Sequence, residues 1–119
     1  MKPEGWPTVI PRLFTDDTAG LVRFLRAVFD ARGEDADGRP AEMRIGESLV
    51  MVSDGAGVRG APKAFLYVYV RDVDAAWRRA LDAGARSLED PADLPYGDRR
   101  ATIEDSWGNT WQIATRRAP

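Results

Sequence analysis

The sequence predicts an α+β fold in which two βαβββ-type repeats form a curved mixed sheet with helices on its outer face. Aromatic and β-branched residues gather in short strand-like runs, and two stretches carry apolar residues at helical spacing. The order of a strand, a helix and two or three further strands occurs twice. The 119 residues suffice for a single domain, with half-repeats at about 7–53 and 64–116 joined by a linker at 54–63.

The first half begins with a predicted strand at Thr8–Phe14. Apolar residues between Leu21 and Phe29 then recur every three or four positions, which predicts an amphipathic helix that ends near Gly33. Glu42–Ile45 and Leu49–Ser53 follow as the two strands of a hairpin.

The second half repeats this order after the glycine-rich linker. Ala64–Val70 is the clearest strand in the chain, because aromatic and β-branched residues fill it. The apolar stripe of Val73–Leu81 predicts a helix that Gly84 terminates. The remaining sequence predicts a short strand at 85–89, a loop at 91–98, and two paired strands at 100–105 and 110–115.

The composition excludes several classes of function. The 17 basic and 19 acidic residues nearly cancel and are interleaved, so no nucleic-acid partner is expected. No run has the length of a membrane span and the first residues lack the apolar core of a signal peptide, so we expect a cytoplasmic protein without a membrane partner. The chain contains no His and no Cys, which removes the common ligands of zinc, copper and iron and the usual nucleophile arrangements.

Two motifs carry a resemblance to a known family: Pro95-Tyr96-Gly97-Asp98-Arg99-Arg100-Ala101 and Asp105-Ser106-Trp107-Gly108-Asn109-Thr110-Trp111. Together with the double pattern, they resemble the glyoxalase/bleomycin-resistance/dioxygenase group of the vicinal oxygen chelate superfamily, and within it the PhnB-like branch. The resemblance runs from about Thr8 to Thr115 and implies a homodimer with ligand clefts on the concave face of the sheet.

Enzymes of this family hold a divalent metal on the first and last strands of each half. The resemblance places these slots at about Ile10, Met51, Phe65 and Gln112. None of the four is a metal ligand of the usual kind, and Gln112 stands where a carboxylate is expected. We therefore expect no metal and no other cofactor, and we disfavour a metal-dependent glyoxalase or dioxygenase.

Strand parity defines the side chains that share the face of these slots, since alternate residues of a strand point to opposite sides. The resulting wall is aromatic and apolar with a few polar groups, and such a wall suits a flat organic ligand. The predicted ligand-binding residues are Ile10, Arg12, Phe14, Met51, Ser53, Phe65, Tyr67, Tyr69, Trp107 and Gln112.

Simpler interpretations stand beside this one. The aromatic residues of the clearest strand fit an exposed or partner-covered face equally well. Trp77 and Trp111 are expected to pack against the core, whereas Trp107 lies in a turn where either role is open. The charges at 98–100 and 104–105 are the place to look for acid–base chemistry, although such groups usually form solvated pairs and turn caps; no catalytic residue is predicted.

The leading hypothesis is a metal-independent binding protein that sequesters an aromatic antibiotic or metabolite in a cleft of a homodimer, which would make it an antibiotic-resistance protein. The alternative is a metal-independent isomerase or lyase-like enzyme that uses Arg12, Glu104 or a tyrosine for proton transfer. A third possibility is a divergent metalloenzyme with Asp and Glu ligands.

Overall fold

The computed structural model describes residues 1–55 and 61–118 and contains two helices and seven strands within them. The predicted linker at 54–63 therefore lies partly outside the described residues. The elements are β1 (Arg12–Phe14), α1 (Thr18–Phe29), β2 (Ala41–Ile45), β3 (Ser48–Ser53), β4 (Phe65–Tyr69), α2 (Val73–Asp82), β5 (Arg86–Asp93), β6 (Asp98–Glu104) and β7 (Thr110–Arg116). The predicted α+β class is confirmed.

The strands form two sheets with the orders β1-β3-β2 and β4-β7-β6-β5. In each sheet the first strand of the half pairs in parallel with the last, and the last pairs antiparallel with the strand before it. The position that β5 fills in the second half is reduced in the first half to one bridge between Arg32 and Arg44. The two halves thus share one topology, and the first is the shorter version.

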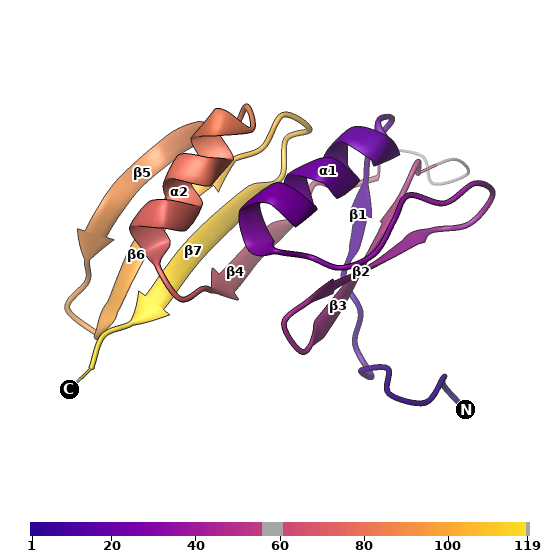
Figure 1. The fold of residues 1–119 in the computed structure, drawn as a ribbon, viewed down its shortest axis with the longest axis horizontal. Coiled ribbons are helices and arrows are strands. Elements are labelled where there is room, and N and C mark those ends of the chain that lie inside the picture. The colour runs from indigo at the N-terminus through magenta and orange to yellow at the C-terminus, as the bar shows by residue number, and fades with distance from the viewer. Residues whose placement is uncertain (56–60, 119) are drawn as a thin grey trace.

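The predicted single curved sheet is not what the structure contains, because its two sheets are separate. The halves are joined through their helices, which pack against one another on the same side of the sheets (Figure 1). The Arg79 guanidinium donates from Nη2 to the carbonyl oxygen of Val28 at 2.9 Å, near the end of α1. At the other end of α1, Trp107 Nε1 donates to Oδ2 of Asp17, the N-cap residue, at 3.2 Å.

The hydrophobic core lies between the helices and the two sheets. Leu21, Leu25 and Val28 come from the inner stripe of α1, and Ile103 and Trp111 come from β6 and β7. The Trp111 ring packs on Phe29 with the ring centroids 5.0 Å apart. Because the core lies on the helix side of the sheets, side chains on the opposite faces are not needed for it.

Several element ends differ from the sequence prediction. Helix α1 ends at Phe29 instead of near Gly33, because Asp30 adopts the left-handed conformation (φ 54°) that stops a helix. Strand β1 begins at Arg12, since Pro11 has no N–H for the ladder, although its carbonyl still accepts from Met51 N at 2.9 Å.

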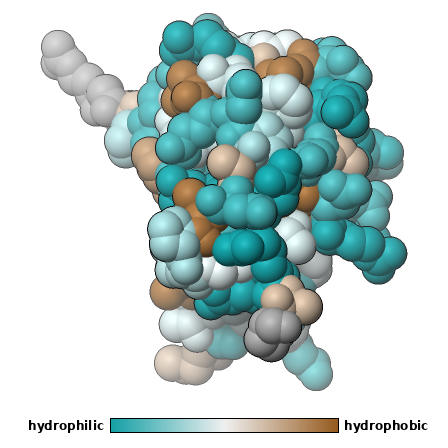
Figure 2. All heavy atoms as spheres, turned by 90° about the vertical axis from the view of Figure 1, so that its left-hand side faces the viewer, coloured by the Kyte–Doolittle hydropathy of each residue, from teal (hydrophilic) through white to brown (hydrophobic). Residues whose placement is uncertain are grey.

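The predicted loop at 91–98 is the largest error of this kind, because β5 continues to Asp93. Pro91 is tolerated because β5 is an edge strand with register shifts between Ser87, Glu89 and Ala92. The side of the molecule at β5 is mostly hydrophilic (Figure 2), as expected of an edge that avoids pairing with other chains. In the described residues neither helix is long and apolar enough to cross a membrane.

Candidate functional site

The outer face of the second sheet carries three aromatic side chains from one strand. Burial alternates along β4, so that Leu66 and Val68 pack on the core while the aromatic residues point away from the helices. The exposed fractions are 66% for Phe65, 39% for Tyr67 and 60% for Tyr69. Three aromatic side chains exposed on one strand mark a surface that is suited to contact with another molecule.

The two tyrosines share a buried carboxylate. Tyr67 Oη donates to Asp98 Oδ2 at 2.7 Å and Tyr69 Oη donates to the same oxygen at 2.9 Å. Asp98 opens β6 and is only 1% exposed, and the two rings lie edge to face with centroids 5.5 Å apart. Arg116 Nη1 lies 3.4 Å from Asp98 Oδ1 as an ion pair, while Oδ1 accepts no hydrogen bond from the described residues.

These contacts set the charge states of the cluster. The hydrogen bond from Tyr67 is the main cause that lowers the pKa of Asp98, and it outweighs the burial of the carboxylate, which acts in the opposite direction. Partial burial, followed by hydrogen bonding with Tyr96 and Asp98, raises the pKa of Tyr67. The pKa of Tyr69 is raised chiefly by its bond to Asp98. At neutral pH the cluster is thus one carboxylate held by two neutral phenols.

A row of polar side chains crosses the sheet beside this cluster. Tyr67 is paired with Gln112, Gln112 with Thr102, and Thr102 with Glu89. Gln112 Nε2 donates to Thr102 Oγ1 at 3.5 Å, and Thr102 Oγ1 in turn donates to Glu89 Oε1.

Arg100, which lies on the same face, donates to Tyr96 Oη at 3.0 Å and to Glu89 Oε1 at 3.2 Å. The polar groups of this face are therefore connected to one another on the strands beside the aromatic side chains.

The first sheet presents a smaller set of the predicted residues. Arg12 pairs with Met51 and Phe14 pairs with Ser53, and the Arg12 Nη2 lies 3.3 Å from Met51 Sδ. Leu13, between the two β1 residues, is fully buried in the core, so Arg12 and Phe14 lie on the opposite face. Ile10 precedes the strand and is partly exposed.

The structure brings together four of the ten predicted residues on the second sheet and four on the first. The group on the second sheet consists of Phe65, Tyr67, Tyr69 and Gln112. The group on the first sheet consists of Arg12, Phe14, Met51 and Ser53, and Ile10 lies just before β1. Trp107 joins neither group. Its ring packs edge to face on Phe24 of α1 at 5.9 Å, on the helix side.

Sequence reasoning singled out the charges at 98–100 but did not place them beside the aromatic residues, and it missed Thr102 and Glu89. Asp98, Arg100 and Thr102 belong to one face of β6, because they alternate with Arg99, Ala101 and Ile103, of which Ala101 and Ile103 are buried in the core. The alternation of β6 was the available signal, but the expected loop at 91–98 concealed where the strand begins. Glu89 was hidden by the register shifts of β5.

The residues at the four metal slots do not fit a metal ion. On the first sheet Met51 lies beside Arg12, and on the second sheet Gln112 lies beside Tyr67, so neither slot has the carboxylates and imidazoles that a metal needs. Among the described residues no group of three or more Asp or Glu side chains is arranged to hold a metal.

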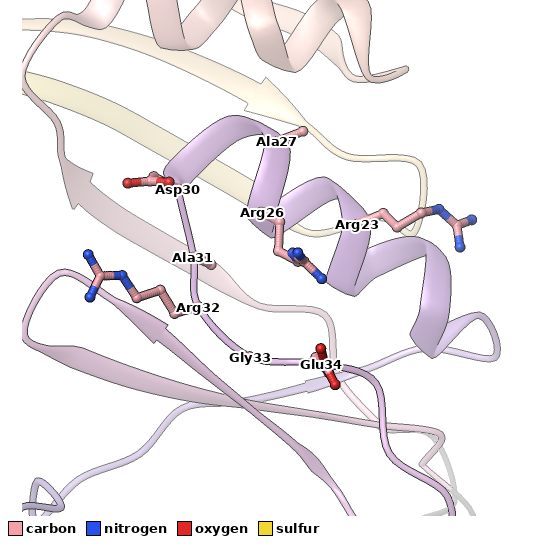
Figure 3. Close-up of a pocket in the computed structure, with 8 residues that line it drawn as sticks. All are labelled: Arg23, Arg26, Ala27, Asp30, Ala31, Arg32, Gly33 and Glu34. Carbon is pink, nitrogen blue, oxygen red and sulfur yellow. The ribbon is translucent and has the colours of Figure 1, made fainter.

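Two hollows lie beside the sheets and helices: the larger has Tyr67 and Tyr69 in its lining, and the smaller has none of the predicted residues. A groove of about 1010 Å³ runs between β4 and the β2–β3 hairpin, with Arg32, Arg44 and Arg79 among its lining residues. A shallower hollow of about 670 Å³ lies beside α1, where Arg23 and Arg26 of the helix and Glu34 of the following segment border it (Figure 3). Its charged side chains are exposed and of mixed sign, which is typical of a solvated surface.

Comparison with known proteins agrees with this architecture. The sequence profile of the Glyoxalase/Bleomycin resistance protein/Dioxygenase superfamily matches residues 8–113. An uncharacterized protein of Mycobacterium bovis is 31% identical over 125 residues, covering 90% of this chain and 82% of that protein. An uncharacterized protein of Mycobacterium tuberculosis is also 31% identical, with 73% of its length covered.

Solved structures show the same fold. The crystal structure of TioX from Micromonospora sp. ML1 is 24% identical with a TM-score of 0.74, covering 95% of this chain and 98% of that one. A glyoxalase/bleomycin resistance protein/dioxygenase family enzyme from Burkholderia phytofirmans is 19% identical with a TM-score of 0.77, covering 88% and 94%.

Proposed function

The chain belongs to the glyoxalase/bleomycin resistance protein/dioxygenase superfamily, and within it we propose a protein that binds a flat aromatic molecule without a metal. The observation that carries this proposal is the exposed aromatic row of Phe65, Tyr67 and Tyr69 on the sheet face where family enzymes hold their metal. Rings on such a face bury large area against a planar ligand, and the polar row on the neighbouring strands sets its orientation.

We propose that the protein works as a homodimer in the cytoplasm, in which a second copy covers the aromatic face and leaves room for the ligand. In one chain the predicted residues are divided between two separate sheets, and the aromatic row is open to solvent. A ligand between two faces is desolvated far better than a ligand on one, which favours a paired arrangement. Light scattering of the purified chain should give twice the monomer mass.

Sequestration of an antibiotic or a metabolite is the role we propose for this site, and it extends the resemblance to the PhnB-like branch. The sequence contains no His and no Cys, so it lacks the common metal ligands and the usual nucleophile–base pairs. A sequestering protein lowers the free concentration of its ligand by binding it, so the degree of protection depends on the affinity and the abundance of the protein.

A metal-independent isomerase or lyase-like enzyme is the second candidate. The observation in its favour is the short contact between Tyr67 Oη and Asp98 Oδ2, since a phenol paired with a carboxylate is a route for a proton. Glu104 has a weaker claim, because Arg86 Nη2 already pairs with it at 2.8 Å. Turnover of a bound compound that is lost in Tyr67→Phe would favour this candidate over sequestration.

Calorimetric titration of planar antibiotics into chelator-treated protein tests the proposed binding. We expect saturable binding that Phe65→Ser weakens about tenfold or more, because the ring supplies stacking area. Leu88→Ser is the matched control, since Leu88 is also an exposed apolar residue (44%) but belongs to β5 at the far edge of the sheet. Absence of binding across the panel, or equal loss in both variants, would argue against the proposal.

A further inference from the structure

The hydroxyl protons of Tyr67 and Tyr69 are both committed to Asp98. Each phenol has one proton to donate, and each donates it to Asp98 Oδ2, at 2.7 and 2.9 Å. The lone pairs of the Tyr69 oxygen stay free to accept, whereas the Tyr67 oxygen also has Tyr96 beside it. Since both side chains are well exposed on the aromatic face, a ligand there meets hydrogen-bond acceptors where two hydroxyl donors would otherwise be expected.

Redirecting either hydroxyl to a ligand would be costly. Asp98 is 1% exposed, and its second oxygen accepts no hydrogen bond from the described residues. If a tyrosine turned to donate to a ligand carbonyl or carboxylate, this buried carboxylate would lose one of its two hydrogen bonds. The loss of a hydrogen bond to a buried charge is expensive, so the phenols resist this change.

The neighbouring cations are already engaged. Arg116 Nη1 donates to the Tyr96 carbonyl at 2.6 Å and lies 3.4 Å from Asp98 Oδ1. Arg100 is bound to Tyr96 Oη and to Glu89. Both guanidiniums thus already pair with a carboxylate, although Arg100 Nε has no hydrogen-bond partner among the described residues.

From this arrangement we propose that the Tyr67–Asp98–Tyr69 cluster selects ligands whose aromatic ring carries a hydrogen-bond donor, above all a protonated amine or a hydroxyl. The inference rests on the proposed binding function and adds the polarity of the ligand to it. A cation gains further from the tyrosine rings, whose faces attract positive charge. Asp98 acts here as a positioning residue, because it works through the two phenols.

Four naphthalene compounds that differ in one substituent at the same ring carbon test the proposal. Naphthylmethylamine and naphthol donate a hydrogen bond, whereas methoxynaphthalene and naphthoate only accept one. Titrated into the full chain, the two donors should bind about tenfold more tightly than the two acceptors, the difference one hydrogen bond makes.

Variants separate this inference from the proposed function. Tyr69→Phe removes one acceptor oxygen from an exposed side chain and should reduce the preference for the amine several-fold without changing methoxynaphthalene binding. Asp98→Asn should shift the preference toward naphthoate, and Tyr69→Phe keeps the test decisive if that buried variant fails to fold. Phe65→Ser should weaken all four compounds alike, and Leu88→Ser should weaken none.

The outcomes are distinct. The inference is supported if the wild type binds the two donors more tightly than the two acceptors and if Tyr69→Phe reduces this preference. Naphthoate binding as tightly as the amine, or a preference unchanged in Tyr69→Phe, overturns the inference but leaves the binding function standing. If none of the four compounds binds, or if Phe65→Ser changes nothing, the binding function and this inference are both wrong.

Discussion

Asp105 shows how much of the family motif is structural. Its Oδ1 accepts from the backbone N–H groups of Trp107 and Asn109, both at 2.9 Å. Its Oδ2 accepts from Asn109 Nδ2 at 3.0 Å and from Trp111 Nε1 at 2.9 Å. Four donors around one buried carboxylate fix the β6–β7 turn, and Asn109 Oδ1 extends the network to the Ala64 N–H before β4.

Replacing that carboxylate should destabilise the fold without touching the aromatic face. Asp105→Asn keeps the size of the side chain but turns an NH₂ group toward donors, which leaves buried groups unpaired. We expect a loss of about 2–4 kcal/mol in the free energy of unfolding, measured by urea denaturation. Ser106→Ala next to it, where the side chain is exposed, should cost far less.

The hydrogen bonds of Tyr67 and Tyr69 to Asp98 should make the stability of the protein depend on pH in the alkaline range. The pKa values of Tyr67 and Tyr69 are raised, so their contribution to stability is complete below the ordinary tyrosine pKa of about 10 and is lost as the pH rises toward the folded-state values. Phenolate absorbance should therefore appear for these two side chains only above that pH, and more easily in Asp98→Asn.

The carboxylate of the cluster behaves in the opposite way at acid pH. Because the pKa of Asp98 is lowered in the folded state, its contribution is present above the ordinary carboxyl pKa of about 4 and disappears as the pH falls through the lowered value. Chemical denaturation of the wild type across this acid range should show the loss, and the double variant Tyr67→Phe/Tyr69→Phe should show a smaller one. An identical acid profile for both proteins would contradict the assigned hydrogen bonds.

At the scale of elements, the contact between α1 and the β6–β7 turn joins the two halves. Gly20 lies on α1 under the Trp107 ring, and a Cβ at this position would lie 2.9 Å from Trp107 Cζ2 and closer still to the Asp17 carboxylate. Asp17 is also the N-cap of the helix and accepts from Gly20 N at 3.0 Å. The glycine is needed here for close approach and not for an unusual φ.

Gly20→Ala should therefore destabilise the protein although alanine is the better helix former. The expected loss is about 1–3 kcal/mol, the cost of inserting a methyl group into a packed contact. Thermal unfolding measures it, and Ala19→Gly on the same turn is a useful comparison because it removes volume instead of adding it. A Gly20→Ala protein as stable as the wild type would show that the halves do not pack as described.

The elements also show where sequence reasoning reaches its limit. The alternation of β4 and the stripes of both helices depend on local periodicity, so the sequence predicted them closely. The length of β5 depends on its place at the sheet edge, where Pro91 is acceptable, and no local pattern reveals that place. The end of α1 depended on whether Asp30 takes the left-handed conformation, which Asn and Asp do only in some contexts.

At the scale of the whole molecule, the family and the α+β class could be predicted, but the arrangement of the site could not. Parity alone placed Phe65, Tyr67 and Tyr69 on one face, as the structure has them. The Asp98 contact required the strand register of β6, and the separation of the two sheets required the tertiary packing of the helices. The position of Trp107 in a turn leaves both a ligand contact and core packing open, and only the tertiary structure shows its ring against Phe24 of α1.

The measurement that tests the central claim most directly is amide chemical-shift mapping by NMR while naphthol is titrated into chelator-treated protein. We expect saturable shifts that are concentrated on β4 and its neighbour β7, around Phe65, Tyr67, Tyr69 and Gln112. Shifts centred instead on the arginine-bordered hollow beside α1, or a requirement for added metal, would contradict metal-free binding on the aromatic face.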